Sequence, residues 1–165
     1  MRLIVTDANI FIDMAAGELL ESMFALRIEF AVPDILYLEE LHENYATLPG
    51  LGLRVWPMSE TVVADAEVLR TRYRKPGQND LFALALARSQ QCPLLTGDRD
   101  LRLAAEQEEA EVHGTLWLVE RMVQELDLAL DTVERAYRLM EEDGSRLPWP
   151  EVRRQLRRLA KTQEQ

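Results

Sequence analysis

The chain has 165 residues, which is enough to bury the core of one globular domain. Of these residues 47% are hydrophobic and 29% are charged, and this composition excludes a disordered chain. Its formal net charge of −10 excludes a protein that holds nucleic acid only by neutralising phosphates. A single cysteine, Cys92, excludes an internal disulfide.

Short apolar runs predict buried strands, and these runs alternate with helical patterns along the chain. The expected strands are residues 2–6, 28–32, 53–56, 93–96 and a last strand at Val112. The expected helices are residues 17–27, a helix after the N-cap Asp34, residues 60–73, a helix opened by Asp80, residues 99–107, a helix from residue 115, a span near 128–142 and a terminal helix opened by Pro148. Residues 47–53 are rich in glycine and proline and are expected to form a loop.

Apolar strands that alternate with helices are typical of an open parallel sheet covered on both faces. We therefore predict an α/β fold: a three-layer α/β/α domain over residues 1–120 with a short central parallel sheet. The helical patterns that follow predict a helical C-terminal extension over residues 121–165.

Acidic residues fall where such a sheet binds its ligands, outside the carboxyl ends of the strands. Asp7 follows the first strand and Asp98 follows the strand at 93–96, while Asp80 opens an apolar helix. Taken singly, each has a local explanation, because turns and helix starts favour aspartate. Together, carboxylates at one edge repel each other unless a hard cation binds there. The pattern therefore predicts a site for Mg²⁺ or Mn²⁺.

A fourth carboxylate comes from the helix after the second strand, where two glutamates are adjacent. Glu39 lies four residues after Ile35 and one after Leu38, so α-helical spacing places it on the inward face. Glu40 stacks with Leu36 on a face that we expect to be more exposed. Helical spacing favours Glu39 as the metal ligand, and Glu40 remains the alternative.

Four segments in this order, TDANIF, PDILYLEEL, NDLFALALA and LLTGDRDL, resemble the four acidic motifs of PIN domains. The resemblance covers about residues 1–118 and includes the VapC-like toxin ribonucleases of bacterial toxin–antitoxin pairs. It implies a PIN-like nuclease domain over residues 1–120 that hydrolyses RNA with Mg²⁺ or Mn²⁺. The alternative is a non-catalytic PIN-like module that binds RNA or protein.

The resemblance also implies a role for each motif residue. The acidic, metal-binding and catalytic residues would be Asp7, Glu39 (or Glu40), Asp80 and Asp98. The supporting polar residues would be Asn9, Thr96 and Asp100.

The partners expected from this reading are RNA, an antitoxin protein and a second copy of the chain in a homodimer. Arg72, Arg74 and Lys75 precede the Asp80 helix and are candidate RNA contacts. Arg153 and other basic residues form a stripe on the last helix; we interpret it as docked on the acidic domain, with contact to RNA or an antitoxin as alternatives. No stretch is long and apolar enough to span a membrane and no signal-peptide pattern is present, so we expect a cytoplasmic protein.

Overall fold

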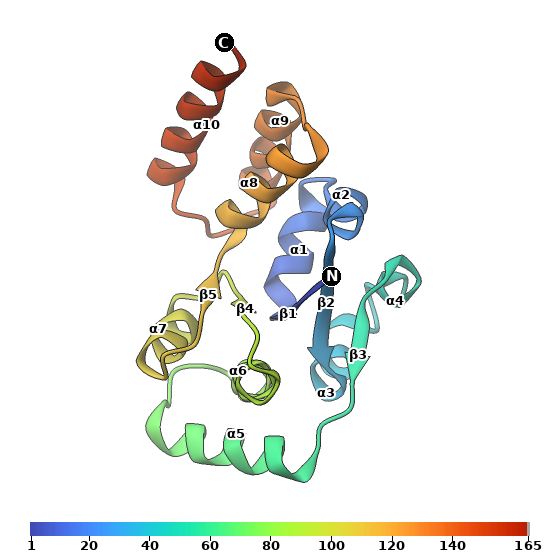
Figure 1. Ribbon diagram of the computed structural model, residues 1–165, viewed down its shortest axis with the longest axis vertical. Coiled ribbons are helices and arrows are strands. Elements are labelled where there is room, and N and C mark those ends of the chain that lie inside the picture. Colours follow the sequence, from blue (N-terminus) through green and yellow to red (C-terminus); the bar gives the residue numbers. More distant parts are fainter. Residues whose placement is uncertain (165) are drawn as a thin grey trace.

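The strands are short and apolar, and they pair side by side in one direction. In the computed structural model, which describes residues 1–164, they form a five-stranded sheet in the order β3-β2-β1-β4-β5 with every pair parallel (Figure 1). The strands are β1 (Arg2–Thr6), β2 (Ile28–Pro33), β3 (Arg54–Trp56), β4 (Leu94–Leu95) and β5 (Val112–His113). The predicted α/β fold with a parallel sheet is confirmed.

Helices cover the sheet on both sides. In chain order they are α1 (Ala8–Ala16), α2 (Leu20–Ala25), α3 (Asp34–Leu36), the π-helical turn η1 (Tyr37–Leu41), α4 (Leu48–Leu51), α5 (Glu60–Arg72), α6 (Gln78–Gln90), α7 (Arg99–Gln107), α8 (Thr115–Leu126), α9 (Leu130–Glu142) and α10 (Trp149–Gln163). Helix α6 packs on β1, β2 and β4, with α5 behind it, at the bottom of Figure 1. In that view α2 lies at the upper end of β2 and α1 lies beside β2, both on the side away from α5.

The N-terminal third differs most from the sequence-based expectation. A helix, α1, starts directly after Asp7 and had not been predicted; nearly all of its residues are buried or half-buried, so only Asn9 marks an exposed face. The helix expected over residues 17–27 begins only at Leu20, since Glu18 adopts a positive φ of 58° and separates α1 from α2. Asp34 is the first residue of α3 rather than its N-cap, and the expected loop at 47–53 contains the short helix α4.

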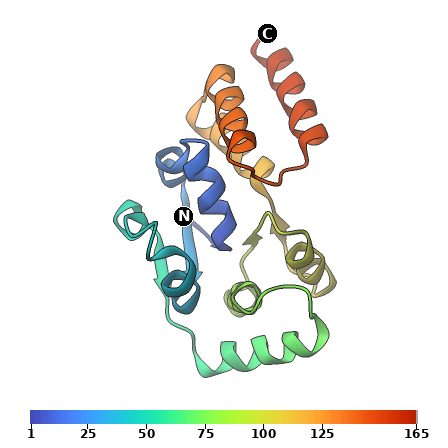
Figure 2. The same cartoon turned by 180° about the vertical axis from the view of Figure 1, so that it is seen from behind.

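The last three helices pack onto the first two and onto each other. Helix α8 contacts α2, α9 contacts α1, and α10 runs beside α9 (Figures 1 and 2). A Cβ atom at Gly17 would lie 2.6 Å from Cε of Met140, so α9 approaches the end of α1 closely. The buried side chains of α9 and α10 belong to the same hydrophobic core as those of the sheet. The division at residue 120 stays a prediction, and α8 runs across it.

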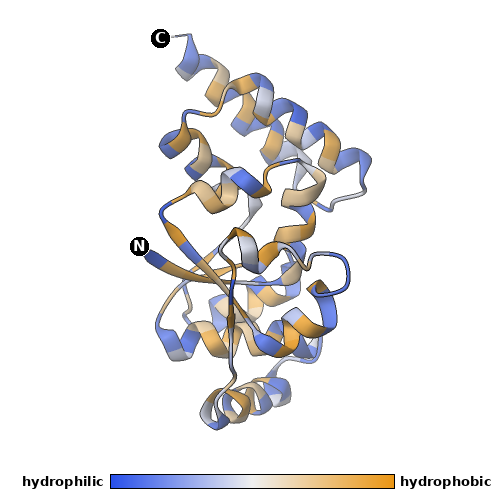
Figure 3. Ribbon diagram, turned by 90° about the vertical axis from the view of Figure 1, so that its right-hand side faces the viewer, coloured by the Kyte–Doolittle hydropathy of each residue, from blue (hydrophilic) through white to orange (hydrophobic). Residues whose placement is uncertain are grey.

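Hydrophobic residues are concentrated in the strands and on the inward parts of the helices (Figure 3). Among residues 1–164, no helix is long and apolar enough to cross a membrane.

Replacing Met140 with alanine tests how firmly the C-terminal helices belong to this core. Met140 is fully buried against α1, so we expect Met140→Ala to lower the free energy of unfolding by about 2–5 kcal/mol. Urea denaturation followed by circular dichroism should show one transition, with an unchanged slope. The control Leu103→Ala removes a side chain that is 45% exposed and should change stability little. Two separate transitions would contradict a shared core.

Candidate functional site

Asp7 lies at the carboxyl end of the central strand and is fully buried. Its carboxylate caps α1, because Oδ1 accepts a hydrogen bond from the Ile10 amide at 3.2 Å. The hydroxyl of Thr96, at the end of β4, donates a hydrogen bond to Oδ2 of the same carboxylate. Thr96 Oγ1 also accepts from the Asp98 amide at 3.0 Å. Thr96 therefore links Asp7 to the segment that carries Asp98.

The other two predicted aspartates also sit at helix starts. Asp98 is the N-cap of α7, and its Oδ1 accepts from the Leu101 amide at 2.8 Å. Asp80 lies in the first turn of α6, where its Oδ2 accepts from the Gly77 amide at 3.3 Å. These bonds are the local reasons for aspartate at helix starts, and they leave carboxylate oxygens free to accept from other partners.

Electrostatic coupling shows that the three carboxylates share one neighbourhood. The pKa of Asp7 is raised to about 7, mainly because the carboxyl is buried; the charges of Asp80 and Asp98 also raise it, and the hydrogen bonds from Thr96 and Ile10 lower it. The pKa of Asp80 is raised to about 6, again mainly by burial and next by the charge of Asp98. The charges of Asp80 and Asp98 therefore disfavour ionisation of Asp7, and the charge of Asp98 disfavours ionisation of Asp80.

The glutamate segment is shaped by the π-helical turn η1, in which the His42 amide donates to the Tyr37 carbonyl at 2.8 Å. The expected inward face was wrong: Leu36 is fully buried, whereas Leu38 is 64% exposed. The reason is that apolar side chains occupy every position from 35 to 38, so helical spacing fits more than one face, and the face that packs inward carries Leu36, Tyr37 and Leu41.

Both glutamates are exposed, and the structure gives them different neighbours. Glu39 Oε2 accepts a hydrogen bond from Asn79 Nδ2 at 2.9 Å. The charge of Glu40 is among the groups that raise the pKa of Asp80. Both line a hollow of about 350 Å³ together with Asp80. Glu39 and Glu40 therefore both stay candidates, and Glu40 is the one that acts on an aspartate of the cluster.

The donor set can be tested against the cation that the sequence predicts. Within residues 1–164, no three His, Cys, Asp or Glu side chains lie close enough together to form a ready metal site. The donors at this edge are carboxylate oxygens, which are the ligands that Mg²⁺ and Mn²⁺ prefer. Their chemistry fits such an ion, while their mutual repulsion opposes a tighter grouping in its absence.

The predicted supporting residues Asn9 and Asp100 line a neighbouring hollow of about 550 Å³, together with Asp98. Asp13 lines it as well and had not been identified from the sequence. Burial raises the pKa of Asp13, whose Oδ1 accepts a hydrogen bond from Ser145 Oγ at 2.8 Å. The available signal was the spacing of four between Asn9 and Asp13, which places both on one face of a helix.

The basic residues before α6 lie in different surroundings. Arg72 pairs with Glu108 at 2.9 Å, so its guanidinium is already held by a carboxylate of the domain. Arg74 and Lys75 are exposed and form no ion pair within the described part of the chain. They remain the candidate RNA contacts of this cluster.

The basic residues on α10 also fall into two groups, one paired with a carboxylate of the domain and one unpaired. Arg158 forms two hydrogen bonds with the carboxylate of Glu120 on α8, which agrees with a helix docked on the domain. Arg153, Arg157 and Lys161 are exposed and, among residues 1–164, have no ion-pair partner.

Comparison with known proteins gives one finding at the level of the family. A family model described as a PIN domain matches residues 3–161, which includes every predicted site residue and most of the C-terminal helices. No curated protein matches the chain.

The buried Asp7 carboxylate predicts a pH-dependent change in stability. Because the pKa of Asp7 is higher in the folded chain than its ordinary 3.8, the folded state loses stability as the pH rises through about 7. Asp7→Asn removes this charge, so the variant should be more stable than the wild type by up to about 4 kcal/mol near pH 8.5, and by much less near pH 5.

Urea denaturation at the two pH values, in EDTA, measures this difference. The control Asp131→Asn changes an exposed residue of α9 and should shift stability equally at both values. If the change in stability caused by Asp7→Asn were the same at both pH values, burial would not raise the pKa of the Asp7 carboxylate.

Proposed function

The chain belongs to the PIN-domain family, and from this premise we propose that it is a nuclease that hydrolyses RNA internally with Mg²⁺ or Mn²⁺. The observation that carries the proposal is the coupling of Asp7, Asp80 and Asp98. These aspartates come from three separate segments, and the charge of Asp98 raises the pKa of both Asp7 and Asp80. Titratable groups perturbed in this way at one strand edge are typical of a functional site.

Asp7, Asp80 and Asp98 would hold the cation together with Glu40 or Glu39. When bound, Mg²⁺ or Mn²⁺ makes water a better nucleophile and stabilises negative charge on a phosphate group. The protein's own part is to hold these oxygens in place. Thr96 holds the Asp7 carboxylate by its hydroxyl and the Asp98 segment through an amide, so two acidic groups are positioned by one side chain.

The cost of burying Asp7 supports a functional reason for this residue. A fully buried carboxylate with no cationic partner destabilises a fold, and an uncharged residue would cap α1 as well. A bound cation would remove the penalty by favouring the ionised carboxylate.

The finer context follows from the family resemblance. We propose that the protein is a cytoplasmic toxin of a toxin–antitoxin pair, bound by an antitoxin and assembled as a homodimer. The support is the order of the four acidic motifs and the PIN-domain match. The second candidate function is a non-catalytic PIN-like module that binds RNA or protein. The observation that favours this second function is that, within residues 1–164, the carboxylates do not lie close enough together to form a ready metal site.

Cleavage assays on the full chain test the nuclease. We expect the purified protein to degrade single-stranded RNA with Mn²⁺ or Mg²⁺ and to be inactive in EDTA, because carboxylates alone offer no nucleophile or charge stabilisation. Asp80→Asn should reduce cleavage to the level seen in EDTA, while the control Asp131→Asn should cleave as the wild type. Cleavage that persists in EDTA would contradict the metal-dependent mechanism. RNA binding without cleavage across diverse substrates would favour the non-catalytic module.

The two glutamates can be separated by matched variants. We expect Glu40→Gln to reduce cleavage more than Glu39→Gln, because Glu40 acts on Asp80, whereas Glu39 is bound to Asn79. Both variants keep side-chain size and remove one charge. Initial cleavage rates over a range of Mn²⁺ concentrations should show a higher metal requirement for Glu40→Gln. A larger loss for Glu39→Gln would restore the assignment made from helical spacing.

A further inference from the structure

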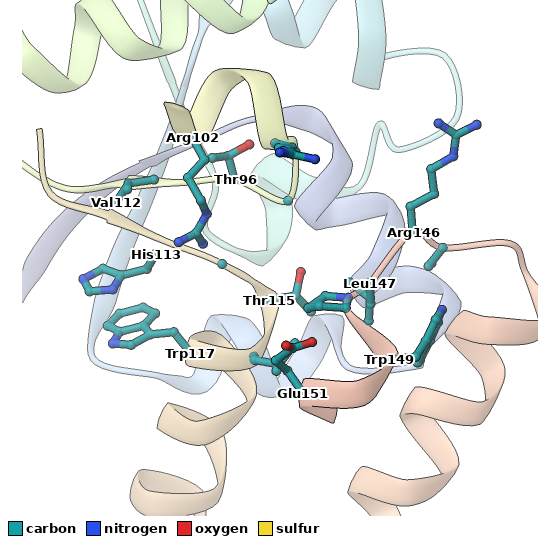
Figure 4. A pocket seen from close by; sticks show the side chains of 16 residues that line it. Thr96, Arg102, Val112, His113, Thr115, Trp117, Arg146, Leu147, Trp149 and Glu151 are labelled. Atoms are coloured by element: carbon teal, nitrogen blue, oxygen red, sulfur yellow. The ribbon is translucent and has the colours of Figure 1, made fainter. Parts of the chain in front are cut away.

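A cavity of about 790 Å³ opens beside the acidic edge, between the end of β5, the start of α8 and the segment at residues 145–149 (Figure 4). Its volume lies in the range of small-molecule binding sites. Thr96 and Gly97 line it, and Thr96 is the residue that donates to Asp7. The cavity also shares Gly97 and Arg99 with the neighbouring hollow that Asp98 lines, so it adjoins the predicted catalytic edge.

The lining is positively charged in an otherwise acidic chain. Arg99, Arg102 and Arg146 line the cavity and, within residues 1–164, form no ion pair. The one acidic side chain on the lining, Glu151, is paired with Arg154 at 2.7 Å. Unpaired guanidinium groups in a recess are suited to phosphate, which they can bind through two parallel hydrogen bonds.

Aromatic rings stand on both sides of this recess. His113 and Trp117 are stacked, with ring centroids 4.1 Å apart and planes 13° apart. Trp149 stands on the opposite side (Figure 4). Aromatic faces next to cationic groups are the usual means by which proteins hold unpaired nucleotide bases.

A phosphate position is marked at the base of the cavity. Arg102 passes over Gly114 so closely that a Cβ added there would lie 2.7 Å from Nη2. Gly114 is also the N-cap of α8, whose first amides are free to bind an anion. The hydroxyl of Thr115, on the lining, is buried and makes no hydrogen bond within 3.5 Å in the described part of the chain, although it is near enough to Asp13 to lower the pKa of that carboxyl.

We propose that this cavity binds a nucleotide of single-stranded RNA next to the scissile bond. The base stacks against Trp117 or Trp149, and its phosphate binds Arg102 and the start of α8. From this nucleotide the RNA strand would pass Gly97 on its way to Asp7 and Asp98. This inference rests on the proposed function, since it assigns a binding subsite to the same substrate. It also explains how an acidic domain holds RNA: the arginines bind the strand and the carboxylates are left for the cation.

RNA binding measured apart from cleavage tests the cavity. The probe is a fluorescein-labelled single strand of roughly 12 nucleotides, titrated with the full chain in EDTA and followed by anisotropy. Trp149→Leu should weaken binding at least about fivefold through loss of stacking. Arg102→Gln should weaken binding and reduce the slope of log affinity against log salt by about 1.

The matched controls are Arg138→Gln, an exposed arginine of α9, and Trp56→Leu, a tryptophan at the far edge of the sheet. Both should bind RNA as the wild type does. Urea denaturation checks that each variant is folded. If Trp149→Leu does not fold, Arg102→Gln still tests the cavity.

The outcomes separate this inference from the proposed function. If the wild type cleaves RNA and the cavity variants bind it as the controls do, the cavity assignment is overturned and the nuclease stands. If the wild type binds RNA through the cavity and does not cleave it, the subsite stands and the nuclease falls. Quenching of tryptophan fluorescence by a short acidic peptide, with none by RNA, would overturn the assignment in favour of a protein partner.

Discussion

Burial of the Asp7 carboxylate is the constraint to which the rest of this site is adapted. The residue must follow the central strand directly, because only there does its side chain both cap α1 and meet Thr96 from β4. Its burial makes its ionisation unfavourable, and the nearby charges of Asp80 and Asp98 add to this effect. The hydrophobic core, which extends over the sheet and the C-terminal helices, offsets this cost.

The C-terminal helices are part of this arrangement rather than an attachment to it. Ser145, between α9 and α10, donates to the buried Asp13 of α1, and the segment that follows forms a wall of the arginine-lined cavity. The family match to residue 161 agrees with this, because it runs through α8 and α9 and into most of α10. The acidic edge and the basic recess thus meet at α7, whose N-cap is Asp98 and which carries Arg99 and Arg102, while Arg146 comes from the C-terminal part of the chain.

Much of the fold could be predicted, since strands of a covered parallel sheet are apolar throughout and their ends are marked by aspartate or glycine. Helix α7 begins and ends where expected because Asp98 caps it. Helix α1 was missed, since nearly all of its sides face protein and only Asn9 marks an exposed face; Asp13 was missed with it. The π-turn could not be foreseen, because a single wide hydrogen-bonded ring leaves no mark in composition or spacing. The face predicted for Leu38 was wrong because apolar residues fill positions 35 to 38, and burial rather than spacing decides which of them packs inward.

The π-turn has a consequence for how this helix can change over evolutionary time. A π-turn contains one residue more than the α-helical turn it replaces, so deleting a residue there would restore the α-helix without moving the strand before it. Glu39 and Glu40 both lie within this wide turn, and both line the hollow beside Asp80. The turn therefore presents two consecutive carboxylates to one hollow, although neighbouring residues of a regular α-helix point about 100° apart.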